Sequence, residues 1–496
     1  MITSRIAAIK IHPAIGIARL GNSPDEFFIG PERPGVHARP RGGFRDFHGR
    51  IKRQAARFRL FAYDRKGKVL GEITATDAQI EWTVHLANTK AEWKEFDGLN
   101  PNAPRRNADV VNRTSLIIDP GARTITGRNQ SARFDTGKFL GTAVKLGEIR
   151  SDAKARLVVL GGMGRSSSPT GQPLTTFANN DGWHDDVSDG PVNATVTLKK
   201  GGQIFHGLGA WVIVGPPSFA PAIDHVITLY DCLLQVAVDK LGLKLPAKPS
   251  FTRDIFPILQ RATHMKWVSG MITHPPEGDG PAHTTLPNVI PPPGSPADRK
   301  KIFDRLRDPA TPGSDPSEGS DMPMIHSDFY PAESNQPITR VQYEALRKWK
   351  NGKFINDWHG PLAGQKSVTP KGLDRAGLES CVGGAFYPGI EGSWFLRDVY
   401  TYVEPFRLNT GGLEPGDITK QMAVPWQADF TDCAQDGDLA WWPAARPDDV
   451  FPESGGPQAP WTRGIVNSTT DMVKRWHRLG FVLKNGAKFL ETERRP

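Results

Sequence analysis

Cysteine is scarce in this sequence. Its 496 residues contain only three, Cys232, Cys381 and Cys433. Three cysteines cannot all pair with one another, and none of them has the C-x-x-C spacing that is typical of a zinc or dithiol site. Disulfide bonds are therefore not expected to hold this fold together, and we expect no bound metal.

Long apolar runs are also missing. No stretch of about 18 apolar residues occurs anywhere, which excludes a membrane-spanning helix. The first 22 residues are apolar in patches, but Lys10, His12 and Pro13 interrupt them and argue against a secretory signal. We therefore expect no membrane partner and a cytoplasmic location, with export by a non-standard route left open.

Several common catalytic motifs do not occur. There is no G-x-S-x-G nucleophile elbow, no H-E-x-x-H zincin helix and no S-x-x-K motif, so the common hydrolases lose support. Residues 161–164, with the sequence GGMG, follow an apolar run as a phosphate loop would. However, Ser167 replaces the last glycine of G-x-G-x-x-G and no P-loop lysine follows. We interpret this segment as a β-turn, which disfavours an oxidoreductase with bound flavin or nicotinamide.

The net charge of +9 does not indicate a nucleic-acid partner, because the basic residues are spread along the chain. The densest group lies within residues 39–59 and is expected to be a loop and strand surface. Binding to a phosphate backbone needs cations gathered on one face. A second polar group, residues 179–190, is rich in Asn and Asp. It can hold Ca²⁺ or orient an amine, but we favour side chains that cap turns.

The order of local patterns predicts an α+β fold. Up to about residue 215, short apolar runs bounded by Gly, Pro, Asp and Asn predict antiparallel strands, with a hairpin loop at residues 65–67. Helical spacing and capping residues dominate after that point. We expect a β-rich domain at residues 1–220 and a domain of mixed helices and long loops at residues 221–496. The predicted strands lie at residues 57–62, 80–86, 124–126 and 156–160, and the predicted helices at 222–241, 296–307, 339–350 and 369–381.

The last of these helices carries the candidate chemistry. Thr369 is the expected N-cap, and Gly383-Gly384 end the helix, so Cys381 is predicted in its last turn. Asp374 lies seven residues earlier and therefore on the same helix face as the thiol. Taken by itself, the pattern fits a small buried cysteine, since unpaired cysteines are usually buried and inert.

Five blocks of sequence, in order along nearly the whole chain, carry a resemblance to a known family. They resemble the LodA-like quinoprotein amino acid oxidases, which include lysine ε-oxidases and glycine oxidases. The blocks are KIHPAIGIAR from Lys10, NNDGWHDDVSDGPV from Asn179, GAWVIVGPP from Gly209, CVGGAFYPGIE from Cys381 and WWPAARPDD from Trp441.

This resemblance implies a cysteine tryptophylquinone cofactor, made from Cys381 and either Trp441 or Trp442, with Cys433 as a rival for the cysteine. Oxidation of an amine needs an electrophilic carbonyl and an electron sink, which no unmodified side chain provides. The implied reaction converts a primary amine of a free amino acid, at the α- or ε-position, and O₂ into an aldehyde or oxo acid, ammonia and hydrogen peroxide.

A base must also take a proton from the carbon that bears the nitrogen. Asp374 is the first candidate and Glu391 the second, although Asp374 can instead serve assembly of the cofactor. The resemblance further implies maturation by a separate flavoprotein monooxygenase and a homo-oligomer. The alternative from another functional class is an inactive scaffold or binding homologue that keeps the fold without forming the quinone.

Overall fold

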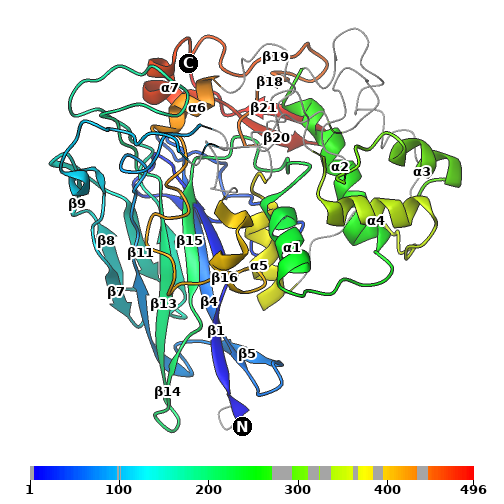
Figure 1. Ribbon diagram of the computed structural model, residues 1–496, viewed down its shortest axis with the longest axis horizontal. Helices are drawn as coiled ribbons and strands as arrows, with labels where there is room; N and C mark the ends of the chain where they lie inside the picture. The colour runs from blue at the N-terminus through cyan, green and yellow to red at the C-terminus, as the bar shows by residue number, and fades with distance from the viewer. Residues whose placement is uncertain are drawn as a thin grey trace.

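The computed structural model describes residues 5–97, 100, 102–270, 293–310, 323, 337–360, 367–383, 395–432 and 445–496. Within these residues, one 13-stranded sheet forms the frame (Figure 1). Its main path runs β7 (Arg123–Thr126), β6 (Ala78–Val84), β13 (Ser188–Leu198), β15 (Ala210–Gly215), β2 (Ile15–Arg19), β4 (Arg53–Tyr63), β12 (Leu157–Leu160), β11 (Gly147–Ser151) and β8 (Ser131–Phe134).

Shorter strands complete this sheet and add small ones. β1 (Ala8–His12), β3 (Phe27–Ile29) and β5 (Val69–Ile73) pair with β4, and β14 (Ile204–His206) pairs with β13. Most pairs are antiparallel, but β2 lies parallel to β15 and β3 parallel to β4. The small two-stranded sheets pair β9 (Gly137–Phe139) with β10 (Thr142–Val144), β16 (Tyr402–Glu404) with β17 (Arg407–Leu408), β18 (Asp449–Val450) with β19 (Ala459–Pro460), and β20 (Phe481–Asn485) with β21 (Lys488–Thr492).

The helices follow the sheet in the chain. They are α1 (Leu229–Lys240), α2 (Phe256–His264), α3 (Pro296–Phe303), α4 (Arg340–Lys350), α5 (Pro370–Glu379), α6 (Trp426–Asp432) and α7 (Thr469–Arg475). The predicted α+β class is confirmed, as are strands at each of the four predicted places. The hairpin loop at residues 65–67 is also confirmed, because Asp64 Oδ1 accepts hydrogen bonds from the backbone N–H groups of Lys66 and Lys68.

Capping side chains set where the helices begin. Ser295, Thr339 and Thr369 each accept a backbone N–H three residues further on and are N-caps, as predicted for Thr369. The prediction of a helix from residue 222 is wrong, because α1 begins at Leu229. Thr228 and Asp231 form a capping box there, and this box satisfies the backbone donors that a longer helix would use.

Two helix ends also differ from prediction. α3 ends at Phe303 and not near residue 307. α5 ends at Glu379 with Ser380 as C-cap, so Cys381 lies just beyond the helix and not in its last turn. The Ser380 hydroxyl donates to the Gly377 carbonyl at 2.8 Å and so takes up one of the backbone acceptors at this helix end.

The basic group at residues 39–59 is only in part the predicted surface, because Arg39 and Arg41 are exposed but other cations are not. Arg45, Lys52, Arg53 and Arg59 are all buried. Arg59 forms an ion pair with Glu32, while Arg53 pairs with Glu148 and Lys52 with Glu26. The Arg45 guanidinium donates to the carbonyls of His477, Leu479 and Glu493. These cations hold separate segments of the chain together, because a buried charge is stable only when it is paired and hydrogen-bonded.

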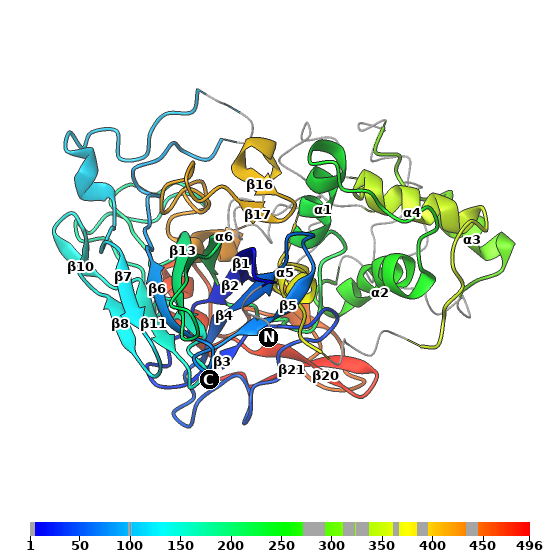
Figure 2. The same ribbon diagram turned by 90° about the horizontal axis from the view of Figure 1, so that it is seen from below.

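The helical part packs directly on the sheet. Figures 1 and 2 show α5 beside β1 and β2, with α1 on its far side, and the contacts between these elements agree. A single hydrophobic cluster includes residues from both parts. The last strand of the main sheet ends at Gly215 and α1 begins at Leu229, on either side of the expected boundary near residue 220, which stays a prediction.

No helix in the described ranges is both long and apolar enough to cross a bilayer.

Candidate functional site

The candidate site lies where α5 meets the end of strand β2. Strand β2 is parallel to β15, and both β2 and β12 are antiparallel to β4, so β2, β12 and β15 end at the same edge of the sheet. Close packing holds this edge together. A side chain at Gly161, just after β12, would come within 2.2 Å of Val214 in β15, so only glycine fits there.

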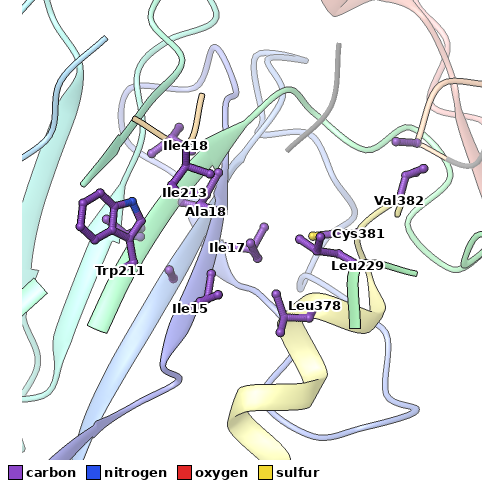
Figure 3. Packing of buried hydrophobic residues seen from close by; sticks show 14 of the residues in the cluster. Ile15, Ile17, Ala18, Trp211, Ile213, Leu229, Leu378, Cys381, Val382 and Ile418 are labelled. Carbon is purple, nitrogen blue, oxygen red and sulfur yellow. The ribbon is translucent and has the colours of Figure 1, made fainter. Parts of the chain in front are cut away.

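Cys381 is 1 % exposed and lies at this edge. Figure 3 shows it among the apolar side chains of Ile17, Leu229 and Leu378. Its sulfur lies 3.3 Å from the carbonyl oxygen of Gly377, to which the thiol donates. Of the cysteines that the structure describes, neither Cys232 nor Cys381 takes part in a disulfide.

The backbone around Cys381 is fixed by the start of α1. The carbonyl of Cys381 accepts a hydrogen bond from Leu229 N at 3.0 Å, and Gly383 N donates to the Ile227 carbonyl at 2.9 Å. A Cβ atom at Gly383 would lie 2.3 Å from the Thr228 carbonyl oxygen. Glycine is thus required at position 383 by a close approach of two backbone segments.

Arg19, the last residue of β2, is buried at 3 % exposure beside Cys381. Its Nη1 donates to the Pro216 carbonyl at 3.0 Å and its Nη2 to the Ser380 carbonyl at 3.2 Å. The same Nη2 lies 3.6 Å from the sulfur of Cys381. One guanidinium therefore joins the end of β2, the segment after β15 and the segment after α5.

Asp374 faces the opposite end of the same strand. Its carboxylate lies 2.9 Å from Nδ1 of His12 and accepts the backbone N–H of Ala14 at 2.6 Å. The hydroxyl of Tyr63 lies 2.8 Å from the other ring nitrogen of His12. A carboxylate only accepts, so Nδ1 of His12 carries the hydrogen in this contact, and Nε2 of the neutral ring accepts from Tyr63. Burial and the charge of Asp374 raise the pKa of Tyr63 to about 12.

Asp374 and Cys381 both face β2, in keeping with their seven-residue spacing. The structure places the carboxylate at the start of this strand and the thiol at its end. Glu391, Trp441, Trp442 and Cys433 lie outside the described residues.

The polar segment at residues 179–190 caps loops, as we favoured. Asp186 accepts the backbone N–H groups of Met163 at 2.6 Å and Arg165 at 3.1 Å, so a carboxylate of the chain itself occupies the turn at residues 161–164. Burial raises the pKa of Asp186 to about 7. Asp185 forms a fully buried ion pair with Lys90. The described residues contain no cluster of His, Cys, Asp and Glu side chains that could hold a metal ion.

A cavity of about 660 Å³ opens beyond this turn. Residues 161–163 line it together with Asp186 and His184. Three exposed basic residues stand on its wall, namely Arg133, Lys145 and Arg165. The cavity therefore offers positive charge beside the edge at which β12 ends.

Sequence reasoning missed His12, Arg19 and Tyr63 as members of the site. His12 and Arg19 belong to the first block of the resemblance, but no function was predicted for either residue. One signal was available: Arg19 ends an otherwise apolar five-residue strand, and a cation at such a position needs a specific partner. No comparable sequence pattern indicated that Tyr63 belongs to the site.

Comparisons with known proteins match most of the chain to one family. Residues 12–214 match the family described as L-lysine epsilon oxidase N-terminal, and residues 316–452 match the L-lysine epsilon oxidase C-terminal domain. L-lysine 6-oxidase of Marinomonas mediterranea is 30% identical, over 86% of this chain and 71% of the relative.

Solved structures are similar over almost the whole fold. The ε-lysine oxidase of Marinomonas mediterranea superimposes with a TM-score of 0.81 at 26% identity, covering 98% of this chain and 95% of that one. The structure of the Schiff base intermediate of the same organism's L-Lys ε-oxidase with L-Lys gives a TM-score of 0.79, with the same identity and coverage. The chain therefore belongs to the L-lysine ε-oxidase family.

Proposed function

We propose that this chain is an amino acid oxidase whose cofactor is a cysteine tryptophylquinone built from Cys381 and either Trp441 or Trp442. The observation that carries the proposal is the Cys381 thiol, which is buried, outside any disulfide and held beside a guanidinium in a chain of this family. Most buried cysteines contact only apolar groups and are inert, whereas a thiol beside a cation is a reactive one.

The residues present fit such a cofactor. A thioether needs a sulfur with no disulfide partner and a fixed position, and the contacts of Cys381 with Gly377 and Arg19 supply that position. Ala445, the first described residue of the block that begins at Trp441, accepts a hydrogen bond from Phe219 N at 2.7 Å. Phe219 lies three residues after Pro216, whose carbonyl binds Arg19. These contacts support a pairing of Cys381 with the tryptophan block.

Once formed, the quinone supplies the electrophilic carbonyl and the electron sink that amine oxidation requires. The overall reaction consumes the amine, O₂ and water and yields an aldehyde or oxo acid, ammonia and hydrogen peroxide. Within the chain, Cys381 holds the cofactor on the segment after α5. Asp374 or Glu391 takes the proton from the carbon that bears the amine.

The cavity beside the turn at residues 161–164 supports an amino acid as substrate. Arg133, Lys145 and Arg165 on its wall form no ion pair with a described residue, and such a group of cations attracts a carboxylate and raises the local concentration of an anionic ligand. We further propose that the free amino acid, O₂ and a maturing flavoprotein monooxygenase are the partners of this chain, and that it acts as a homo-oligomer.

Intact-protein mass spectrometry after co-expression with the flavoprotein tests the proposal. The cross-linked quinone adds two oxygen atoms and removes four hydrogen atoms from the mass of the unmodified chain. A panel of free amino acids, scored by release of hydrogen peroxide, then identifies the substrate. A folded chain that keeps the unmodified mass under these conditions would be an inactive homologue and would overturn the proposal.

A further inference from the structure

Arg19 is an unusual feature of the candidate site, because it places a cation within an apolar core. All five residues of β2 are buried, and Arg19 is 3 % exposed. A guanidinium in such a place is stable only when its N–H groups have acceptors. Two acceptors are the carbonyls of Pro216 and Ser380, and a third contact is made with the sulfur of Cys381.

We infer that Arg19 favours the thiolate form of Cys381 and holds its sulfur in position for cross-linking, so that Arg19 prepares this cysteine for cofactor formation. The effect on the thiol is independent of the proposed function, while the effect on cross-linking rests on it. A nearby cation favours the thiolate, which is the nucleophilic form of cysteine.

The contacts of the sulfur change with its protonation. In the thiol form, the S–H group donates to the Gly377 carbonyl and an N–H of Arg19 donates to the sulfur. Ionisation releases the proton to water and removes the bond to Gly377. The bond from Arg19 then joins two opposite charges, and such bonds are shorter and stronger than neutral ones. The structure therefore provides a contact that strengthens when the thiol ionises.

Other charged side chains on the elements around Cys381 pair with groups other than its sulfur. On α5, Glu379 forms an ion pair with Arg375, and Asp374 lies against His12 at the far end of β2. On α1, Asp231 pairs with Arg261. Among the charged side chains that the structure describes, Arg19 is the one in contact with the sulfur of Cys381.

The thiolate is the form of Cys381 that can act as the nucleophile in cross-linking. The Cys381 S–H and a C–H of the indole become one C–S bond with loss of two protons and two electrons. The electrons pass to O₂ through the flavoprotein monooxygenase of the proposed function. The sulfur must act as the nucleophile in this bond formation, so a larger thiolate fraction at neutral pH speeds the step.

The first experiment uses the full chain made without the flavoprotein. The S–H stretching band in the Raman spectrum, taken as a difference from Cys381→Ala in the same background, reports protonation of the Cys381 thiol even though it is buried. We expect Arg19→Gln to raise the pH midpoint of this band by at least about one unit, a tenfold loss of thiolate at a given pH. Arg19→Lys keeps the charge, so the pH midpoint of its S–H band should stay close to that of the parent chain.

Cys232 provides a matched control. It is also buried, and its sulfur lies 3.9 Å from Nη2 of Arg397, so its S–H band can be isolated with Cys232→Ala. Arg19→Gln should leave this band unchanged. An unchanged Cys381 midpoint in Arg19→Gln would overturn the inference. If Arg19→Gln does not fold, Arg19→Lys decides, because a Cys381 midpoint raised by about one unit or more although the charge is kept would also overturn it.

The second experiment adds the flavoprotein and follows the cross-link by mass spectrometry. Arg19→Gln should cross-link at least tenfold more slowly at neutral pH, and raising the pH should restore the rate. A merely structural role of Arg19 would show no such rescue. If the parent chain forms no cross-link, the proposed function fails while the Raman result stands. If the parent and Arg19→Gln cross-link equally fast, the inference fails and the proposed function stands.

Discussion

The carboxylate of Asp374 lies 2.9 Å from Nδ1 of His12, and this contact ties helix α5 to the end of β1. The same carboxylate accepts the backbone N–H of Ala14, and Tyr63 supports the other side of the imidazole. A chain of hydrogen bonds thus reaches from partly exposed Tyr63 to the helix that leads into Cys381. Any shift of α5 along β2 would break this chain and move the thiol.

We expect Asp374→Asn to lower the stability of the protein. Asparagine can still accept the N–H of Ala14, but it replaces the charged contact with His12, which should lower the free energy of unfolding by about 1–3 kcal/mol. His12→Gln should have a similar effect, and the double variant should lose less than the sum, because the two residues share one interaction. Urea unfolding of the four proteins measures this coupling.

Quinone absorbance and peroxide release on the same preparation separate the roles of Asp374. A variant with full quinone content and turnover reduced about 100-fold or more would assign the proton transfer to Asp374. A variant without quinone would assign it to assembly. Normal quinone absorbance and normal peroxide release would show that Asp374 serves neither proton transfer nor cofactor assembly. Glu391 would then be the remaining candidate base.

Cys381→Ala should abolish the quinone and leave a folded protein. The substitution removes one small buried atom and its contacts with Gly377 and Arg19, so we expect a loss of about 1–2 kcal/mol in the free energy of unfolding. Cys433→Ala is the matched control and should keep the visible absorbance. A Cys381→Ala protein that retains the chromophore would instead assign the cross-link to Cys433.

Local interactions made much of the fold predictable. The helices predicted to begin at residues 296, 339 and 369 begin within one residue of those places, because Ser295, Thr339 and Thr369 cap them. The same kind of local interaction explains why the predicted start of the first helix was wrong. Ile223 and Val226 continue the apolar spacing upstream, but the capping box of Thr228 decides where the helix begins.

The candidate site was predictable only in part, because its contacts join distant positions. Asp374 and His12 are 362 residues apart, as are Cys381 and Arg19. Asp374 and Cys381 both face β2 although Cys381 lies just beyond α5, but helical spacing could not say that they meet this strand. Nor could it show that opposite ends of that strand would receive the carboxylate and the thiol. Such pairings follow from strand order, which no local pattern in the sequence specifies.

Of Trp441→Phe and Trp442→Phe, only one should eliminate the quinone. The segment before Pro443 is expected to be extended, and neighbouring side chains of an extended chain point in opposite directions. Only one of the two indoles can then meet the sulfur of Cys381. Redox staining of the denatured proteins detects the covalent quinone. Staining of both single variants would place the cofactor outside this block.

Asp186 should make the stability of the protein fall as the pH rises from about 4 to about 7. Burial raises the pKa of this carboxyl from 3.8 to about 7, so the folded protein keeps a proton that the unfolded chain has already lost. In that range the folded state binds more protons than the unfolded state, and linkage then requires stability to decrease with pH. Above about pH 7 both states are ionised, and the loss attributable to Asp186 is complete.

Asp186→Asn isolates this contribution. The amide oxygen can still accept the N–H groups of Met163 and Arg165, while the charge is gone. At pH 8 the variant should therefore be more stable than the parent chain. At pH 5 it should be equally or less stable, because the amide nitrogen replaces Oδ1, which has no hydrogen-bond partner among the described residues, and so adds donors without acceptors. Urea unfolding at both pH values measures the difference.

Asp189→Asn is the control for this pair of measurements. Burial also raises the pKa of Asp189, to about 6, but its two oxygens accept four hydrogen bonds, from Trp211, Ile418 and both donors of Thr419. An amide cannot replace a carboxylate there without turning an acceptor into a donor, so Asp189→Asn should destabilise the protein at pH 5 and pH 8 alike. If Asp186→Asn also destabilises it equally at both values, Asp186 is ionised in the folded protein throughout this range and the expected pH dependence is wrong.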